Sequence, residues 1–599
     1  MPVALGQPAS GPVLRMMRVR NRPNGIGGWP NVCDNAPSLI PVLAREVLFF
    51  FKTRLERLRK AVWELNRLCY DSLAINRGGC NYLIFLLEIV LMKKNVLALS
   101  IAAMVGGLGF AGAASAALSV NESGTGHILM VPYYTAQNGN MTVFHLTNTD
   151  TLHGKAVKVR FRGASNSDDV LDFQVFMSPG DVWTAAVTAD ANGLSQLVTA
   201  DNTCTLPRIS AGTPVKFVTD RLAKTDWTAT DKAAQTREGY VEILNMADIP
   251  DNNGDKGLFK AIKHVNGVAP CTSGILNATL SLTGVGPSAT NLSLPGNAAA
   301  TPDLTVPTGG LTGSWYVMNV AQTTTFSGAT PAIVASGATR NVFSHQKTGT
   351  ALLETADPLM VGGAIPTQHY DVPDLSTPYE VAATTAAAQA EELTSAIARN
   401  SVINQYATDA SISAKTDWVF SMPTRRYTIA ANYAAGAVNQ VVGNVSGTSL
   451  AGGTVAVPGA TPAYRYINNN IAVANNIFRT AGNTTVNNAG QICVEAQSQT
   501  FYDREERFQE DGAIFSPGTI SKTQLCGEVS VLAFSTDNSA LAASVARQNV
   551  AAPYTNGWGV VNFNAPTPLL GAAFLKLTNP QAAPGTSGTY GITWPHAYR

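Results

Sequence analysis

The 599-residue sequence is poor in charge, because only 14% of its residues are Asp, Glu, Lys or Arg, against roughly 25% in typical soluble domains. Coiled coils and charge-driven disordered chains need more charge, so the composition excludes both. The 52 glycines and 32 prolines are ordinary fractions without a collagen-like period. Apolar runs long enough to span a bilayer are also scarce, which excludes a bundle of transmembrane helices.

Common catalytic and nucleotide-binding motifs are absent as well. Beyond residue 117 the sequence has no G-x-S-x-G, no H-E-x-x-H, no Walker loop and no G-x-G-x-x-G, so it predicts no enzyme of these classes. The seven histidines are dispersed. His145 and His153 could approach each other across a turn, but two histidines alone make a weak metal site, and we expect solvated positions.

The near-neutral total charge of +1 conceals a split along the chain. Residues 1–91 hold 12 Lys and Arg against 6 Asp and Glu, whereas residues 117–599 hold 27 against 34, a net charge of −7. Nucleic-acid binding depends mainly on basic residues that neutralise phosphates. An acidic body without basic clusters therefore argues against nucleic acid as a partner.

A secretory signal peptide is predicted at residues 92–116. The basic residues Lys93 and Lys94 precede an apolar stretch, and small residues then end in an A-x-A cleavage site. We expect cleavage between Ala116 and Ala117, and hence an exported protein that meets the membrane only through its signal peptide. An uncleaved anchor over the same segment is the alternative, but its many Gly and Ala residues make it weakly apolar.

A signal peptide stands at the beginning of a protein, so we interpret residues 1–91 as a spurious upstream extension. This segment is rich in arginine and contains three of the seven cysteines. A basic amphipathic helix at 41–70 that lies on a membrane surface is the alternative.

Cysteine usage agrees with export. After residue 117 four cysteines remain, Cys204, Cys271, Cys493 and Cys526, and an even number in an exported chain indicates two disulfides with three possible pairings. Proximity in the sequence favours Cys204–Cys271 and Cys493–Cys526, with free buried thiols as the alternative. No C-x-x-C occurs, which argues against a zinc ribbon or a thioredoxin-like redox centre.

Short alternating runs dominate the chain after residue 117. In one of them Val157, Val159 and Phe161 share one face, and basic residues occupy the other. Period-two runs separated by turns rich in Asn, Pro and Gly are typical of antiparallel sandwiches. The clearest runs lie at 141–148, 157–162, 169–176 and 182–187.

We predict a mainly β protein of two immunoglobulin-like antiparallel β-sandwich domains, at 117–375 and 411–599, each with a long polar insertion. Between them, residues 376–410 are rich in Ala and Glu, and Leu393 and Ile397 recur at helical spacing. This period predicts one connecting helical segment.

Four strings carry a resemblance to known proteins: VKVRFRG…DVLDFQVFMSPGDVW (157–183), EGYVEILNMAD (238–248), TDWVFSMPTRRYTI (416–429) and FYDREE (501–506). With them the chain resembles uncharacterised exported cell-surface proteins of Gram-negative bacteria, some of which are surface-layer-like. The resemblance implies an envelope location and brings no catalytic residues with it.

One acidic turn is a candidate cation site. Asp251, Asn253 and Asp255 alternate as oxygen ligands do in a calcium loop. However, Lys256 stands where such a loop has glycine, and Ile262 where it has a bidentate glutamate. A polar turn without an ion is the alternative, and calcium is the one cofactor that the sequence suggests.

Two further features of the sequence could bind carbohydrate. Asp503, Glu505 and Glu506 belong to the densest charge cluster, and paired carboxylates can hydrolyse glycosides, although neighbouring loop positions point apart and favour a salt-bridged turn. Aromatic side chains that are exposed could stack on sugars, but the cores of β-sandwiches also take up tryptophans, which is the alternative. The candidates are Tyr133, Tyr134, Trp183, Trp418 and Trp558.

We therefore expect a structural component of the cell surface or outer envelope, and not an enzyme. It would act through self-association or through contacts with other envelope proteins, because a large surface of low charge suits close packing. An adhesin that binds surface glycans is the first alternative, and a secreted hydrolase with an unrecognised site is the second.

Overall fold

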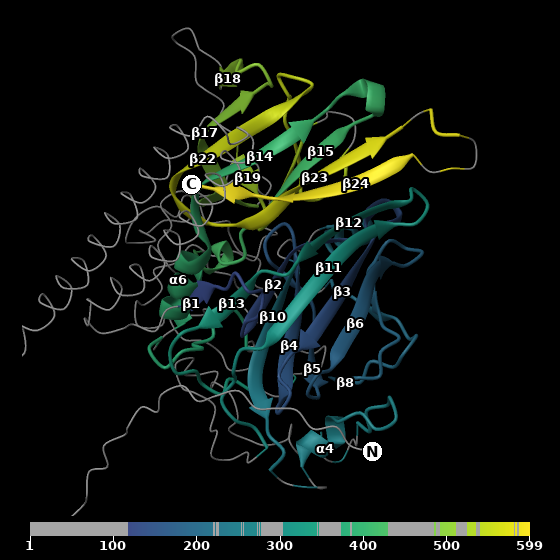
Figure 1. Ribbon diagram of the computed structural model, residues 1–599, viewed down its shortest axis with the longest axis vertical. Helices are drawn as coiled ribbons and strands as arrows, with labels where there is room; N and C mark the ends of the chain where they lie inside the picture. Colours follow the sequence, from purple (N-terminus) through teal and green to yellow (C-terminus); the bar gives the residue numbers. More distant parts are fainter. Residues whose placement is uncertain are drawn as a thin grey trace, which may run out of the picture. The chain divides into compact units, whose positions relative to one another are not determined.

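A computed structural model describes residues 118–276, 303–346, 373–428, 484–486 and 491–599, apart from short gaps, the longest of which covers 511–523. The predicted extension, the signal peptide and its cleavage-site residues Ala116 and Ala117 lie outside these residues. The described part is mainly β, which confirms the predicted fold class (Figure 1). No helix in it has the length and hydropathy needed to cross a bilayer.

Two antiparallel sheets, here called sheets I and II, form the first sandwich. Sheet I has the order β1 (Leu118–Val120), β13 (Ala332–Ala335), β2 (Ile128–Thr135), β10 (Glu238–Ile249), β4 (Gly154–Gly163), β5 (Asp169–Met177) and β8 (Cys204–Leu206). Sheet II has the order β12 (Thr324–Ala329), β11 (Leu311–Asn319), β3 (Met141–Asn148), β6 (Val182–Ala189), β7 (Ser195–Val198) and β9 (Val215–Lys216). One hydrophobic core joins side chains from both sheets.

The second sandwich consists of sheets III and IV, whose facing side chains form another core. Sheet III has the order β16 (Thr484–Val486), β17 (Ile492–Tyr502), β22 (Asn556–Pro568), β14 (Ala398–Ala407) and β25 (Ala597–Tyr598), and β18 (Phe508–Glu510) and β19 (Gln524–Cys526) also pair with β17. Sheet IV has the order β21 (Arg547–Asn549), β20 (Val529–Ala533), β15 (Lys415–Ser421), β23 (Leu570–Thr578) and β24 (Thr589–Pro595).

Strand β4 shows how the alternating sequence is used. Val157, Val159 and Phe161 enter the core between sheets I and II, as predicted. Lys158 and Arg160 point to the opposite face and are also buried, because the segments that contain Gln346 and Pro373 cover this face. Lys158 donates a hydrogen bond to Gln346 (2.8 Å), and Arg160 donates one to the carbonyl of Pro373 (3.2 Å). The charges are compensated within the sheet, with Lys158 2.5 Å from Asp172 on β5.

The helical segment is shorter than predicted. Helix α6 (Ala386–Ile397) buries Leu393 and Ile397 in a core cluster, as their spacing predicts. It ends at Ile397, and β14 begins at the next residue. From there the core-facing residues Val402 and Tyr406 are separated by an even number of positions, which places both on one face of a strand. Short helices α3 (Ala229–Gln235) and α4 (Leu258–Ile262) lie in the first half.

The two sandwiches share a core and belong to one compact unit, which includes the described residues from 118 to 599. The loop 539–546, between β20 and β21, contributes Leu541, Ala543 and Ala546 to the core of the first sandwich. The carboxylate of Glu238, which is buried at the beginning of β10, accepts hydrogen bonds from the N–H groups of Ser544 (2.9 Å), Val545 (2.6 Å) and Ala546 (3.0 Å). The predicted connector therefore separates two sandwiches but not two independent cores.

Asp417 holds the other end of this loop and gives a pH-dependent prediction. It accepts hydrogen bonds from the Ser539 hydroxyl and the Leu541 N–H, yet burial raises the pKa of its carboxyl from 3.8 to about 6. The folded state therefore binds the proton more tightly than the unfolded state, and the stability that this gives at low pH is lost as the pH rises through 6.

From about pH 4.5 to about pH 7.5, we expect the wild type to lose about 2 kcal/mol of unfolding free energy relative to Asp417→Asn. Urea unfolding of both chains at the two pH values measures this difference. Curves of stability against pH that run parallel would contradict the role given to Asp417.

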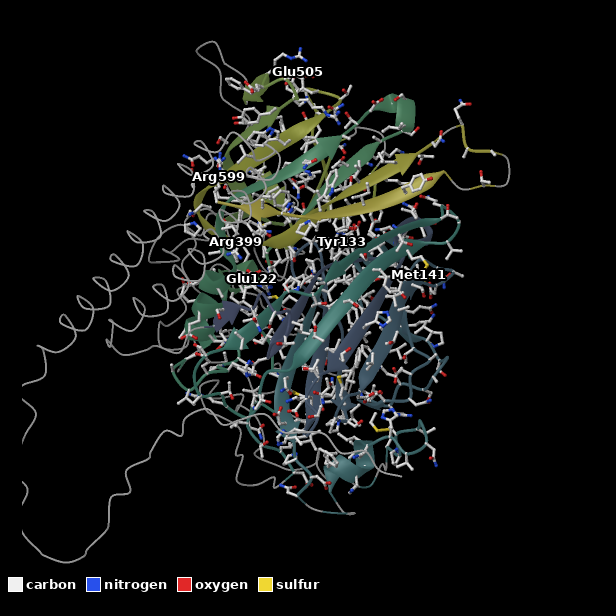
Figure 2. All side chains as sticks on the ribbon, viewed as in Figure 1. Glu122, Tyr133, Met141, Arg399, Glu505 and Arg599 are labelled. Atoms are coloured by element: carbon white, nitrogen blue, oxygen red, sulfur yellow. A yellow bond between two sulfur atoms is a disulfide. The ribbon has the colours of Figure 1, made fainter. Side chains whose placement is uncertain are left out.

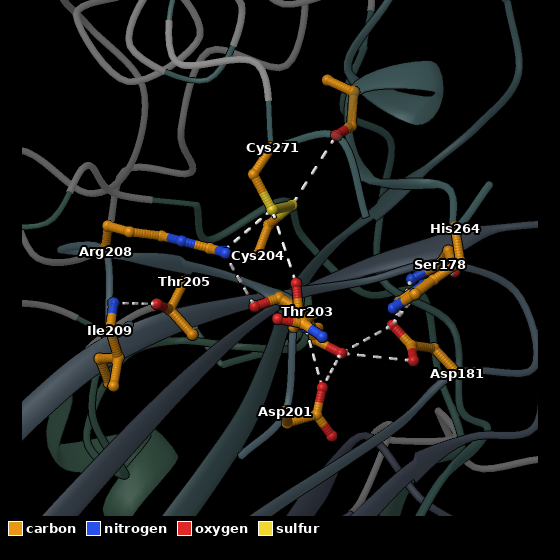
Figure 3. Close-up of a disulfide and its surroundings, with 12 residues drawn as sticks. Ser178, Asp181, Asp201, Thr203, Cys204, Thr205, Arg208, Ile209, His264 and Cys271 are labelled. Atoms are coloured by element: carbon orange, nitrogen blue, oxygen red, sulfur yellow. Dashed lines mark hydrogen bonds and ion pairs between the residues drawn. A yellow bond between two sulfur atoms is a disulfide. The ribbon is translucent and has the colours of Figure 1, made fainter. Parts of the chain in front are cut away.

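Both predicted disulfides are present. Cys204 at the beginning of β8 pairs with Cys271, with the Cα atoms 5.4 Å apart, and Cys493 on β17 pairs with Cys526 directly opposite on β19. Figure 3 shows the first bridge, where Arg208 Nη1 lies 3.0 Å from Cys271 Sγ. The favoured pairing is confirmed, and two disulfides are compatible with an oxidising environment.

Candidate functional site

A groove of about 680 Å³ opens at one end of the second sandwich. Ligand pockets have volumes of roughly 300–1,000 Å³ and combine apolar walls with a few polar groups. The groove has this composition. Its lining is Gln405, Tyr406, Ala407, Ile412, Tyr502, Asp503, Arg504, Glu506, Asn556, Gly557, Trp558, Leu575, Leu577 and Trp594. Glu505, in the loop between β17 and β18, marks this end of the molecule in Figure 2.

An aromatic row crosses three strands beside the groove. Tyr502 on β17 is paired with Phe508 on β18 and with Trp558 on β22. The rings of Tyr502 and Trp558 are stacked, with centroids 4.1 Å apart and an interplanar angle of 6°, and Phe508 follows at 5.8 Å. Phe501, the neighbour of Tyr502, is in the core, so alternation puts the row on the outer face of sheet III.

Strand β14 lies on the side of Trp558 opposite to Tyr502. Tyr502 covers one face of the Trp558 ring, and Gln405 on β14 is the cross-strand partner of Trp558. Gln405 is exposed and lines the groove together with Trp558. A flat apolar surface therefore has an amide group beside it.

Tyr406 brings an unsatisfied polar atom into the groove wall. Its ring is stacked on Phe534 at 4.9 Å and packs edge-on against Phe501, so the side chain is fixed. The hydroxyl is buried and has no hydrogen-bond partner among the described residues. Burial, with Tyr554 and Asp503 nearby, raises the pKa of Tyr406 to about 12, so the hydroxyl keeps its proton. Such an atom costs stability unless something that enters the groove satisfies it.

The predicted charge cluster forms a turn at the rim of the groove. Asp503 accepts hydrogen bonds from the N–H groups of Glu505 and Arg507 (both 2.9 Å) and an ion pair from the Arg507 side chain. Burial alone would raise the pKa of Asp503, but these bonds bring it below its ordinary value. An ionised, saturated carboxylate is a poor general acid, and Glu505 and Glu506 are exposed. The geometry thus favours binding over glycoside hydrolysis.

Most of the aromatic residues predicted for sugar contact are in the core. Tyr133, Tyr134, Trp183 and Trp418 are each at most 2% exposed, so sugar contact is wrong for these four and the alternative, a place in the core, holds. Only Trp558 lines the groove. The other aromatic residues of the site, Tyr406, Tyr502, Phe508 and Trp594, were not predicted. Phe508 and Tyr502 flank the charged turn in FYDREERF, and such a pair across a hairpin is the signal that could have indicated them.

The structure describes only part of the predicted calcium site. Asp251 lies 3.6 Å from Lys260, and Asn253 and Asp255 lie outside the described residues. Another cluster, Asp150, His153 and Asp248, has donor atoms within 4.8 Å of one another. The ammonium group of Lys155 already lies between the two carboxylates, 3.1 Å from Asp150 and 2.8 Å from Asp248. This cluster is therefore an ion-pair network.

His145 and His153 have separate partners. His145 is stacked on Tyr316 and hydrogen-bonded to Thr184, and His153 contacts Asp150.

No protein-family model matches the chain, and neither a curated protein nor a solved structure matches it. The groove is therefore the strongest indication of function.

Proposed function

We propose that this chain is an exported protein that binds neutral oligosaccharides in the groove of its second sandwich. One observation carries the proposal. The aromatic stack of Tyr502 and Trp558 lines the same groove as Tyr406, whose buried hydroxyl has no partner in the described part of the chain. The disulfides and the predicted signal peptide support export.

A pyranose ring has the chemistry that fits such a groove. Its C–H faces are apolar and stack on aromatic rings, while its hydroxyls both donate and accept hydrogen bonds. Trp558 and Trp594 offer ring surface, and the amides of Gln405 and Asn556 offer donors and acceptors. The rim carries charges of both signs, with Arg507 paired to Asp503, so it favours a neutral sugar over an acidic or basic one.

This proposal corresponds to the first alternative drawn from the sequence. A structural role in the envelope, the resemblance to surface-layer-like proteins and self-association stay predictions. A glycan-binding groove is compatible with a location at the cell surface, where polysaccharides are abundant. Calorimetric titration of the exported chain with a panel of neutral, acidic and amino-sugar oligosaccharides tests the proposal, which requires binding to a neutral member.

Tyr406→Phe separates a binding role for the hydroxyl from a structural one. Since the hydroxyl is buried without a partner, we expect its removal to leave the unfolding free energy unchanged or to raise it by up to about 1 kcal/mol. Binding of the neutral oligosaccharide should weaken about tenfold, because one hydrogen bond in a buried site is lost. Affinity that stays within twofold of the wild type would contradict ligand contact with this hydroxyl.

A further inference from the structure

Three side chains meet where a covering segment crosses the outer face of sheet I. Lys158 on β4 donates hydrogen bonds to the carboxylate of Asp172 (2.5 Å) and to the side-chain oxygen of Gln346 (2.8 Å). The side-chain amide of Gln346 donates in turn to Asp172 (2.5 Å). An amine, an amide and a carboxylate thus contact one another, although the amine and the amide are 188 residues apart in the sequence.

The segment that carries Gln346 is held against the sheet by the residues before it. The N–H group of Val342 donates to the carbonyl of Met246 on β10 (3.0 Å). The ring of Phe343 is fully buried and packs against Phe176 on β5. These contacts bring Gln346 to the strands β4 and β5, which are neighbours in sheet I (Figure 1).

The amine lies close to the amide in a buried place. The side chains of Lys158 and Asp172 are at most 5% exposed, and Gln346 is buried as well. The amide carbon Cδ is bonded to the oxygen that Nζ approaches, so the amine is near the ~3–3.5 Å from which it could attack. Well-oriented intramolecular reactions reach effective molarities of ~10⁵–10⁸ M, so this placement favours reaction between the two groups.

One carboxylate oxygen contacts both nitrogen atoms. Oδ1 of Asp172 accepts hydrogen bonds from Nζ of Lys158 and from Nε2 of Gln346. If the amine attacks the amide, Nζ must lose protons and Nε2 must gain them. A carboxylate between two such atoms can act first as general base and then as general acid. Arg160 lies 3.5 Å from the other oxygen, Oδ2, and helps to hold the carboxylate in this orientation.

We propose that Lys158 and Gln346 become joined by an isopeptide bond, with Asp172 as the proton carrier. The bond between Nζ and Cδ forms, and the bond between Cδ and Nε2 breaks. Two protons leave the Lys158 ammonium through Asp172 and reach the departing nitrogen, which leaves as an ammonium ion. Atoms and charge therefore balance without an oxidant, a reductant or water. The proposal is independent of glycan binding and of export.

This bond would close a loop from β4 to the segment after β13. A cross-link stabilises a protein mainly by restricting the unfolded chain, and more so for a longer loop. Thiols exchange with disulfides but do not cleave amides. The first sandwich would thus keep one covalent cross-link even after Cys204–Cys271 is reduced.

The test uses the full chain, which is purified, reduced, digested with trypsin and analysed by mass spectrometry. A modified Lys158 is not cleaved, so we expect peptide 156–160 to be linked to peptide 341–347. The mass of the linked product should lie about 17 Da below the sum of the two peptides, because ammonia is lost. Fragmentation should place the link between Lys158 and Gln346.

Two methionine variants identify the glutamine that reacts. Gln346→Met removes the amide at similar length and should abolish the linked product. Gln174→Met is the matched control, because Gln174 is a second buried glutamine and lies directly opposite Lys158 on β5. Its amide donates to the sulfur of Met246 (4.0 Å), and its replacement should leave the linked product in place.

Asp172→Asn tests the proton carrier, because an amide cannot take up the protons. Samples taken at intervals after an isotope pulse should show that linking is at least about 100-fold slower than in the wild type. If this variant does not fold, the wild type and the two methionine variants decide the question.

A wild-type digest in which peptide 341–347 occurs only in its unlinked form would overturn the proposal. A linked product that persists in Gln346→Met or disappears in Gln174→Met would overturn the choice of partner. Linking at the wild-type rate in Asp172→Asn would overturn the role of the carboxylate. None of these results bears on oligosaccharide titration, so failure of the isopeptide bond and failure of the groove are distinguishable.

Discussion

A chain in which alanine replaces Glu238 is expected to lose about 3–5 kcal/mol of unfolding free energy. The carboxylate is fully buried and satisfies the N–H groups of Ser544, Val545 and Ala546 and the hydroxyl of Tyr133 (3.0 Å). Its loss would remove the acceptor of these four donors, of which the Ala546 N–H and the Tyr133 hydroxyl are buried, and would release a loop that contributes to the core of the first sandwich. Chemical unfolding followed by tryptophan fluorescence measures the loss.

Two further variants test whether the loss of hydrogen bonds causes the loss of stability in Glu238→Ala. Glu238→Gln keeps one acceptor oxygen, and since burial already raises the pKa of this carboxyl, we expect the amide to cost only about 1–2 kcal/mol. Glu122→Ala, on an exposed turn, should change stability by less than about 0.5 kcal/mol. A loss below about 1 kcal/mol for Glu238→Ala would show that the loop is held by other contacts.

The second large effect is expected at Trp558. Its replacement by alanine removes ring surface from the groove and breaks the stack with Tyr502. Aromatic anchors of binding sites contribute about 2 kcal/mol or more, so binding of the neutral oligosaccharide should weaken at least about 30-fold. The cost in stability should stay near 1 kcal/mol, since the ring is half-buried on the outer face of a sheet.

Tyr590→Ala is the matched control for nonspecific contact with exposed rings. Tyr590 is an exposed aromatic residue (61%) on β24 of the same sandwich and does not line the groove. The control should bind as the wild type does. If Trp558→Ala keeps its affinity, or if both variants lose affinity equally, the ring of Trp558 is not the sugar platform.

Local patterns were sufficient to predict much of the fold. Val157, Val159 and Phe161 reach the core because a strand turns every second side chain to one face. The pairings Cys204–Cys271 and Cys493–Cys526 agree with proximity in the sequence. The immunoglobulin-like topology stays a prediction.

The site could not be predicted to the same extent, because it depends on pairing between distant segments. Tyr502 and Trp558 belong to different strands and become neighbours only through the register of β17 and β22. The exposure of a tryptophan also depends on tertiary structure. Trp183, Trp418 and Trp558 all lie in strands, but Trp183 and Trp418 face hydrophobic cores. Likewise, sequence alternation put Lys158 on a polar face but could not show that Gln346 covers it.

The most direct test of the groove is an NMR titration of the exported chain, labelled with ¹⁵N at its tryptophans, with the neutral oligosaccharide that binds best. The indole N–H signals of Trp558 and Trp594, which line the groove, are predicted to shift in a saturable way. Those of Trp183 and Trp315, which are buried in the core of the first sandwich, should stay in place. Binding without any shift at Trp558 or Trp594 would contradict the account.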